Sequence, residues 1–238
     1  MPDISKLREE KPGKTSFMKY REKEAGEKGK KFRVSQEWVP LSRISSYLIK
    51  ATLVSEDDKF WKHEGFDYEA IQKAIEKDIK AKRFKLGGST ISQQLVKNLY
   101  LSPAKNPFRK IAEAVITWRM EKVLSKKRIL ELYLNVVEWG EGTFGAEAAS
   151  RRYFGKSAAD LSPEEAARLA AVLPNPRKYD PAGDQRYVVN RSNLIYGIMV
   201  KRGIVIPEYS EVAEEGAPSS ESGNDPTRTP IEKLRPAD

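Results

Sequence analysis

Apolar residues recur at four-residue spacing through the middle of this chain, and no run of alternating β-branched residues interrupts them. The two clearest series are Ile71, Ile75 and Ile79, with Asp67 as the expected N-cap, and Ile91, Leu95 and Leu99. This spacing places apolar side chains on one face of a helix, whereas a half-buried strand needs strict alternation. We therefore expect a mainly α fold.

Helix boundary signals support the same fold class. Ser162 precedes Pro163, and Glu165 follows three residues after the serine, which is the pattern of a capping box with proline at the first helical position. Ser125 can cap a short helix, and a longer helix is expected over about residues 108–124.

The two ends of the chain differ in composition from its middle. Residues 1–35 are polar and rich in Lys and Glu, so we expect a flexible or weakly helical lead-in. Residues 207–238 are rich in Pro, Ser, Gly and acidic residues, which is typical of a disordered tail. The folded domain is therefore expected over residues 36–206.

The formal net charge is +9, and the folded domain itself contains more Lys and Arg than Asp and Glu. A basic domain implies an anionic partner, which could be nucleic acid, an anionic membrane surface or a phosphorylated substrate. No stretch of about 18 or more apolar residues occurs, so the sequence predicts no membrane-spanning helix.

Glu56 lies between an apolar helical segment and two aromatic residues, Phe60 and Trp61. The ordinary explanation is an exposed helix end. The alternative is functional, because a carboxylate packed against aromatic rings loses water, and a desolvated carboxylate is suited to general base or acid catalysis.

The segment Gly87-Gly88-Ser89-Thr90 opens a predicted helix. Backbone N–H groups at such a position can hold an anion, but a plain turn capped by Ser89 explains the pattern as well. Gln93 and Lys97 are four residues apart and share the helix face opposite Ile91. This face therefore offers hydroxyls, an amide and a cation in sequence.

Glu113 falls within the apolar stripe formed by Ile116, Met120 and Leu124, and Arg109 lies four residues before it. An ion pair at this spacing on a solvated face would be unremarkable in energy. A carboxylate inside an apolar stripe, however, is costly unless it has a partner. Glu113 is therefore a candidate for function.

Lys97, Lys105, Arg109 and Lys110 form a basic series between two predicted helices. A solvated face is one explanation and nucleic-acid binding is another. The series lacks the interleaved aromatic residues of single-strand binders.

Side chains that bind metals tightly are scarce. The chain has no cysteine, which excludes disulfides and thiolate metal sites, and His63 is its only histidine. A metal site on His63 would need Asp or Glu partners, and no tight cluster is visible. We therefore favour a packed or hydrogen-bonding histidine over a metal ligand.

Five segments in order resemble the motifs of the family 51 peptidoglycan glycosyltransferases. The first is a Glu-Asp pair followed by Phe and a His-x-Gly-x-Asp pattern, and the second matches almost letter for letter. The five segments are 56–67, 87–98, 109–113, 127–135 and 190–193, with Arg191 in the last. The resemblance spans roughly residues 38–200. Segments 136–140 and 173–176 are similar to the monofunctional branch of the family.

This resemblance implies a lysozyme-like, mainly helical fold with a large lobe and a small membrane-facing lobe. It also implies polymerisation of lipid II, with release of undecaprenyl diphosphate. Carried over by motif, Glu56 is the catalytic base and Glu113 the second essential acid. The implied substrate-binding residues are Ser89, Thr90, Gln93, Gln94, Lys97, Asn98, Lys105, Arg109, Lys110 and Arg191. Lys105 stands where many relatives have Arg, so a point charge replaces a bidentate fork.

The chemistry fits one carboxylate and a cluster of cations. A base must take the proton of the attacking sugar hydroxyl, while a diphosphate leaving group needs cations rather than a protonating acid. We therefore expect inversion by a single displacement. A retaining glycosidase would instead need two carboxylates about 5–5.5 Å apart. The alternatives are a lysozyme-like enzyme that cleaves glycan and a basic helical protein that binds nucleic acid.

We expect no required cofactor, and treat a divalent cation, Mg²⁺ or Mn²⁺, at the diphosphate as an option. The expected partners are lipid II, the growing lipid-linked glycan and the membrane surface, with cell-division or elongation proteins as further candidates and no nucleic acid. The resemblance places the protein at the periplasmic face of the bacterial inner membrane. The N-terminal membrane helix usual in monofunctional relatives is not found in this sequence.

Overall fold

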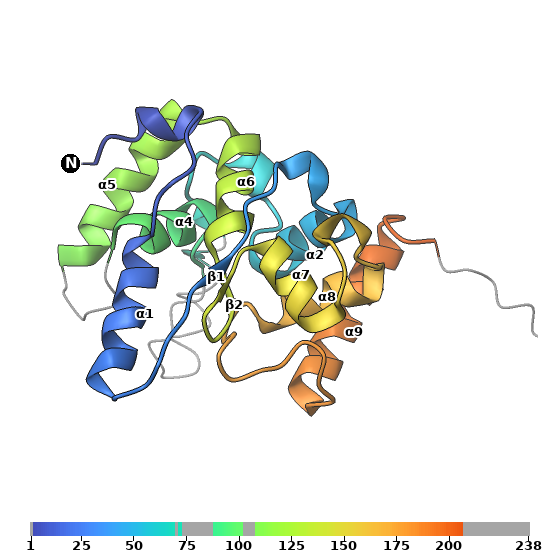
Figure 1. Ribbon diagram of the computed structural model, residues 1–238. Coiled ribbons are helices and arrows are strands. Elements are labelled where there is room, and N and C mark those ends of the chain that lie inside the picture. The colour runs from blue at the N-terminus through green and yellow to red at the C-terminus, as the bar shows by residue number, and fades with distance from the viewer. Residues whose placement is uncertain (1, 70, 73–87, 102–107, 207–238) are drawn as a thin grey trace, which may run out of the picture. The chain divides into compact units, whose positions relative to one another are not determined.

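The computed structural model describes residues 2–69, 71–72, 88–101 and 108–206, and most of them lie in helices (Figure 1). The α-helices are α1 Ser16–Glu27, α2 Ser46–Glu56, α4 Ile91–Tyr100, α5 Phe108–Val123, α6 Lys126–Val136, α7 Ala146–Phe154, α8 Pro163–Val172 and α9 Arg186–Lys201. Short 3-10 helices lie at Ser5–Arg8, Leu41–Arg43, Phe60–Lys62 and Ala158–Asp160. The mainly α class predicted from the apolar spacing is confirmed.

The helix boundaries follow the local signals closely. Ser162 and Glu165 form the predicted capping box, and the Ser125 hydroxyl accepts the Arg128 N–H at 3.2 Å at the start of α6. At α4 the cap is Thr90, in a second capping box with Gln93, and not Ser89 as one interpretation of the sequence had it. Threonine takes this place because its backbone is extended immediately before the first helical residue.

The helix predicted around Ile71 is described only at its start. A helical turn begins after Asp67, whose carbonyl accepts the Ile71 N–H at 2.9 Å. Ile75, Ile79 and the expected tail over residues 207–238 lie outside the described residues.

Residues 1–35 differ from the flexible or weakly helical lead-in that we expected, because they contain the twelve-residue helix α1 packed against α4. Ile4, Leu7 and Met18 are buried in the core. Few apolar residues hold this segment, but they are supported by an ion pair in which Arg21 binds Glu138, 117 residues away. A polar composition concealed these long-range contacts.

A three-stranded sheet of very short strands was not predicted. Its strands are β1 Ser35–Gln36, β2 Glu138–Gly140 and β3 Thr143–Phe144 in the order β1-β3-β2. β1 pairs parallel with β3, matching Ser35 to Thr143, and β2 pairs antiparallel with β3. Two or three residues are too few to show alternation in a sequence. The sheet fixes β2 beside the helices that carry the site.

Seven of the eight α-helices in the described residues form two packed groups, and α7 packs beside α6 and the short strands (Figure 1). One group contains α2, α8 and α9, and the other contains α4 with α1, α5 and α6. Buried side chains from both groups, including Leu48, Leu95, Tyr133 and Leu169, belong to one continuous core. The carboxyl end of α2 therefore meets the amino end of α4. Whether the groups correspond to the large and small lobes implied by the resemblance stays a prediction.

Candidate active site

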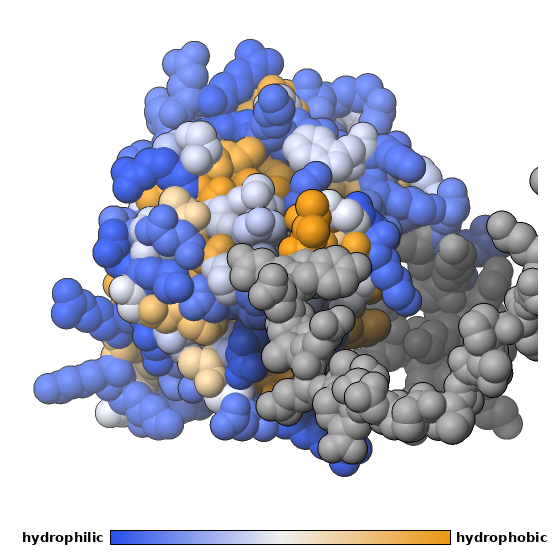
Figure 2. Space-filling model, turned by 90° about the vertical axis from the view of Figure 1, so that its right-hand side faces the viewer, coloured by the Kyte–Doolittle hydropathy of each residue, from blue (hydrophilic) through white to orange (hydrophobic). Residues whose placement is uncertain are grey.

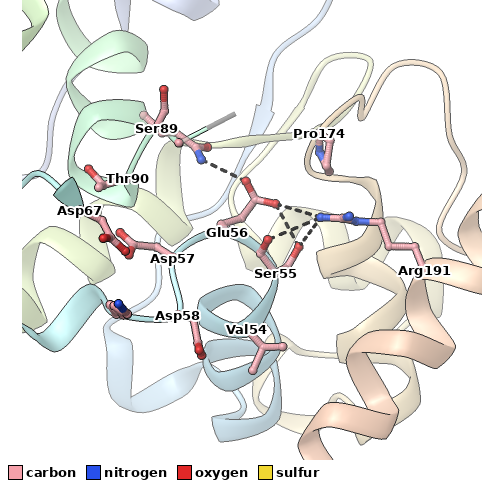
Figure 3. A pocket seen from close by; sticks show the side chains of 13 residues that line it. Val54, Ser55, Glu56, Asp57, Asp58, Asp67, Ser89, Thr90, Pro174 and Arg191 are labelled. Atoms are coloured by element: carbon pink, nitrogen blue, oxygen red, sulfur yellow. Dashed lines mark hydrogen bonds and ion pairs between the residues drawn. The ribbon is translucent and has the colours of Figure 1, made fainter. Parts of the chain in front are cut away.

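Glu56 is the last residue of α2, and its side chain is only 11% exposed. Gln94 Nε2 donates to Glu56 Oε2 at 3.0 Å, and the Ser55 hydroxyl donates to Oε1 at 3.0 Å. Arg191 Nη2 lies 3.7 Å from Oε1, and Figure 3 shows Arg191 and Glu56 pointing toward one another across the pocket. The carboxylate is therefore held by groups from α2, α4 and α9.

The neighbours of Glu56 differ from those suggested by the sequence. Phe60 packs edge-on against Trp61, with ring centroids 5.1 Å apart, and lies beneath the Lys126 ammonium. The hydrogen bonds and ion pair of Glu56 are instead with polar groups of three helices. Because α2 ends at Glu56, the chain changes direction there, and Phe60 and Trp61 lie away from the Glu56 carboxylate.

Tyr133, from α6, fixes the orientation of the Gln94 amide. Its hydroxyl donates to Gln94 Oε1 at 3.0 Å, which leaves Nε2 of the same amide to face Glu56. Burial raises the pKa of Tyr133 well above its ordinary value, and the charges of Glu56 and Asp57 raise it further. The Tyr133 hydroxyl therefore stays protonated, and a donor, at physiological pH.

The Glu56 carboxylate opens into a cavity of about 560 Å³ (Figure 3). The cavity is bounded by the end of α2, the start of α4, the chain after α8 and Arg191 of α9. Its lining residues are Val54, Ser55, Glu56, Asp57, Asp58, Lys59, Asp67, Gly88, Ser89, Thr90, Gln94, Pro174 and Arg191.

A second cavity of about 310 Å³ adjoins the first, because Gln94 and Pro174 line both. Lys97 and Asn98 of α4 line the second cavity, together with residues of α1, β2 and the segment after α8. Glu56 and Lys97 therefore line two adjoining cavities that share Gln94 in their walls.

Lys97 lies in a field of charged groups. The pKa of Lys97 is lower than that of an ordinary lysine, chiefly because the side chain is buried. The positive charges of Arg109 and Lys110 lower this pKa further. The negative charges of Glu113 and Glu56 oppose the shift. Glu113 is buried, as its place in the apolar stripe predicted, and it pairs with Lys110 rather than with Arg109. The second and third motifs thus bring three cations and one buried carboxylate together.

Comparison with known proteins decides the family. The model of the transglycosylase family matches residues 23–200. A biosynthetic peptidoglycan transglycosylase from Dechloromonas aromatica is 58% identical over 169 residues, covering 71% of this chain and 73% of that protein. Proteins of the same name from Nitrosospira multiformis and Azoarcus are 50% and 56% identical, covering 81% and 77% of this chain and 84% and 79% of their own.

The chain belongs to the transglycosylase family. The resemblance predicted from the five motifs is confirmed, and with it the enzyme class, a peptidoglycan glycosyltransferase. The roles of individual residues in this transglycosylase stay predictions.

The candidate substrate-binding residues of the transglycosylase fall into three groups. Ser89, Thr90, Gln94, Lys97, Asn98 and Arg191 line the two cavities. Arg109 and Lys110 lie on α5 and act on Lys97 through their charges. Lys105 lies outside the described residues.

Thr90 and Gln93 have a structural role in this transglycosylase, because they form the N-terminal cap of α4. The Thr90 N–H donates to Gln93 Oε1 at 3.0 Å, and the Thr90 hydroxyl donates to the Gly65 carbonyl at 2.7 Å. Gln93 is buried and lines neither cavity. The capping box uses these side chains to start α4 in the correct place, which positions Gln94 and Lys97.

Asp57 organises the first motif and was not singled out from the sequence. Its buried carboxylate accepts the Ile91 N–H at 2.9 Å and binds His63 Nε2 at 2.9 Å. The Gly65 N–H donates to His63 Nδ1 at 3.1 Å, and the tautomer with its proton on Nε2 satisfies both contacts. The predicted hydrogen-bonding role of His63 is confirmed. The signal for Asp57 was its position directly after Glu56 in the motif.

The described residues contain no group of three or more His, Asp or Glu side chains that could hold a metal ion. Among those same residues, no helix is both long and apolar enough to cross a membrane.

Proposed function

We propose that this transglycosylase polymerises lipid II into glycan strands with release of undecaprenyl diphosphate, and that Glu56 is the general base of an inverting displacement. The observation that carries the proposal is that a nearly buried Glu56 and Lys97 line adjoining cavities that share Gln94. A base and a cation placed in adjoining cavities match a reaction that removes a proton from one sugar and releases a diphosphate from another.

Glu56 is suited to act as the base, because each of its carboxylate oxygens accepts a hydrogen bond and can still accept another. Oε2 accepts one hydrogen bond from Gln94, and Oε1 one from Ser55. A carboxylate has about four acceptor sites, so each oxygen keeps capacity for the hydroxyl of an acceptor sugar. The hydrogen bond to Gln94 helps to orient the carboxylate. Glu56 takes the hydroxyl proton as the oxygen attacks the anomeric carbon of the donor.

The cations suit the leaving group. Lys97 lines the second cavity, and its ammonium makes no hydrogen bond or ion pair with the described residues. It is therefore available to the diphosphate, whose negative charge grows as the glycosidic bond breaks. Arg109 and Lys110 add positive charge, and Glu113 fixes Lys110 through their ion pair. Glu113 would thus act by positioning a cation.

The surroundings of the other carboxylates favour inversion over retention. A retaining enzyme needs a second carboxylate as nucleophile. Three other carboxylates line the first cavity. Asp57 is already engaged by His63 and by the amino end of α4, Asp58 pairs with Arg202, and Asp67 also has an interaction partner. A single displacement needs only Glu56, so the new glycosidic bond should have the opposite anomeric configuration to that of the donor.

We propose no required cofactor. A divalent cation at the diphosphate, Mg²⁺ or Mn²⁺, stays a prediction. The carboxylate associated with the diphosphate-binding cations is Glu113, and it is already paired with Lys110. A magnesium ion is commonly held by one or two carboxylates together with substrate phosphates, so such an ion would depend on the bound diphosphate.

The α5 surface supports a location against the membrane. Ile111, Val115 and Trp118 follow one another at helical spacing and are 65%, 38% and 55% exposed. Trp118 shares a cavity of about 680 Å³ with Tyr68, which is 76% exposed, and Lys122 lies 6.0 Å above the Trp118 ring. Aromatic residues next to lysines suit the boundary between lipid headgroups and acyl chains.

The face drawn in Figure 2 is hydrophilic around its rim and has hydrophobic residues toward its middle. From the exposed apolar and aromatic residues of α5, we propose that this helix faces the periplasmic surface of the bacterial inner membrane. Partner proteins of cell division or elongation stay a prediction.

The test is to incubate the protein with lipid II and, separately, with finished peptidoglycan. We expect lipid II to give a glycan polymer with inverted linkages and one undecaprenyl diphosphate per bond, and finished peptidoglycan to stay intact. Solubilisation of peptidoglycan would favour the glycan-cleaving alternative. Salt-sensitive DNA binding without lipid II turnover would favour the nucleic-acid alternative.

A further inference from the structure

The second cavity contains a carboxylate with no place in the reaction described above. Glu138, at the start of β2, is only 3% exposed and lines this cavity together with Lys97. Its Oε2 accepts two hydrogen bonds from Arg21, at 3.1 Å from Nε and 2.9 Å from Nη2. Its Oε1 is buried and has no hydrogen-bond partner in the described part of the chain.

A buried carboxylate oxygen without a partner is uncommon and costly. Burial accordingly raises the pKa of Glu138, and Arg21 and Arg177 lower it. An oxygen of this kind, in the wall of a cavity, suits a ligand that brings a hydrogen-bond donor.

Arg21 is held in place and cannot itself turn toward a ligand without breaking several contacts. Its Nη1 donates to Glu24 at 3.0 Å, and its guanidinium lies 4.6 Å above the Phe17 ring. Arg177 donates to the same Glu24 at 3.0 Å. These contacts fix one oxygen of Glu138, so the other oxygen is presented in a defined direction.

The wall of the cavity therefore contains Glu138, whose Oε1 has no partner, and Lys97, whose ammonium is unpaired among the described residues. The complementary ligand carries a donor group next to an anion. An amino sugar attached to a diphosphate has this pattern, because its acetamido N–H and its hydroxyls lie close to the phosphate.

We propose that Glu138 Oε1 accepts a hydrogen bond from the amino sugar attached to the lipid diphosphate, through an acetamido N–H or a hydroxyl, and that Arg21 positions this carboxylate. The proposal rests on the proposed function for the identity of the substrate. It gives helix α1, the supposed lead-in, a part in forming the sugar site.

Glu138→Gln is the direct variant. The Arg21 fork binds an amide oxygen as it binds Oε2, so the NH₂ group takes the place of Oε1 and faces the ligand. An acetamido N–H would then meet a donor, whereas a hydroxyl would exchange a charge-assisted bond to the carboxylate for a weaker neutral one. We expect the affinity for a short-chain lipid II analogue to fall about tenfold, whereas the affinity for farnesyl diphosphate, which has no sugar, stays unchanged.

Glu141→Gln is the matched control, because Glu141 follows β2 directly but is well exposed. It should leave both affinities unchanged. Arg21→Lys is the second variant, since it keeps the charge but loses the two-pronged hold on Oε2. Arg21→Lys should lower the affinity for the lipid II analogue by a smaller factor than Glu138→Gln does, and it should leave the affinity for farnesyl diphosphate unchanged. Melting temperatures of all variants show whether the fold is retained.

An analogue whose acetamido group is replaced by hydrogen identifies the donor, because a C–H group does not replace the hydrogen bond of an N–H group. If the acetamido N–H is the partner, wild type loses affinity for this analogue and Glu138→Gln loses little more. If a ring hydroxyl is the partner, Glu138→Gln weakens both analogues equally.

Equal weakening of the lipid II analogue and farnesyl diphosphate by Glu138→Gln would show a purely structural role and overturn the proposal. Unchanged binding of both would overturn it as well. Because binding needs no turnover, a wild type that binds the analogue through Glu138 but does not polymerise lipid II would contradict the proposed function alone.

Discussion

Gln94 Nε2 donates a 3.0 Å hydrogen bond to Glu56 Oε2, and the Gln94 amide is itself oriented by the buried Tyr133 hydroxyl. A side-chain amide can rotate by 180° and exchange its oxygen and nitrogen. The rotated amide would place its oxygen against the Glu56 carboxylate, and the observed orientation is favoured further because the Tyr133 hydroxyl donates to Oε1. The Glu56 carboxylate is therefore oriented in part by a residue on a third helix.

Tyr133→Phe tests this relay. Without the hydroxyl, Gln94 Oε1 loses its donor and the amide is held less firmly against Glu56, so we expect kcat on lipid II to fall about tenfold with little change in KM. The control is Tyr153→Phe, whose hydroxyl makes only a 3.5 Å contact with the Trp139 carbonyl. A rise in KM at constant kcat would contradict a role in aiming Glu56.

Asp57→Asn tests the junction between α2 and α4. The Asp57 carboxylate accepts hydrogen bonds from both His63 and Ile91, whereas an amide must turn its NH₂ toward one of these two donors. We expect the free energy of unfolding, measured by urea denaturation, to fall by about 1–3 kcal/mol.

Asp58→Asn is the control for that experiment. Asp58 neighbours Asp57 but pairs with Arg202 on the surface, so its loss should cost less than about 1 kcal/mol. Equal effects of the two substitutions would show that the buried network does not hold the junction.

Lys97 gives a prediction of pH dependence. Burial lowers its folded-state pKa, so it loses its proton at a lower pH than an exposed lysine does. Affinity for farnesyl diphosphate should therefore decrease as pH rises through this lowered pKa. Lys97→Arg should bind with an affinity that stays flat over the same range, because arginine remains protonated.

The same shift predicts the effect of Lys97 on stability. A lysine whose folded pKa lies below its unfolded pKa destabilises the fold at neutral pH, and this cost disappears as pH rises through the folded and then the unfolded value. Lys97→Met should therefore melt slightly higher than wild type at pH 7, while losing diphosphate binding. A lower melting temperature would mean that Glu113 and Glu56 outweigh the cost of burying the charge.

Trp118→Ser tests the membrane face. Trp118 is more than half exposed on α5, so its removal should leave the melting temperature unchanged. It should weaken binding to vesicles of equal parts phosphatidylglycerol and phosphatidylethanolamine by about tenfold or more. Leu194→Ser, at an equally exposed apolar position on α9, is the control and should bind vesicles as wild type does. Equal losses would mean that α5 has no special part in docking.

The sequence predicted what depends on neighbours along the chain. The capping box of Ser162 and Glu165 and the buried position of Glu113 both follow from spacings of three or four residues within one helix. The motif resemblance placed Glu56 and Lys97 in one site, and the structure brings their two cavities together.

The sequence could not predict what depends on contacts between distant segments. Arg21 and Glu138 are 117 residues apart, and neither has a local pattern that points to the other. At Glu56, proximity in the sequence gave the wrong neighbours. Phe60 and Trp61 follow Glu56 closely in the chain but pack elsewhere. The residues that contact its carboxylate include Gln94 and Arg191, which lie on other helices. The two-residue strand β1 could not be predicted from the sequence either, because it is defined only by its pairing with β3.

The most direct measurement of the central claim is the rate of lipid II polymerisation by Glu56→Gln. The amide keeps the size of the side chain and can still bond to Gln94 and Ser55, but it cannot take a proton from a sugar hydroxyl. We predict a rate at least about 100-fold below wild type, with an unchanged melting temperature and lipid II affinity, and a normal rate for the exposed control Glu64→Gln. A Glu56→Gln variant that polymerises lipid II at nearly the wild-type rate would contradict the assignment of Glu56 as the base.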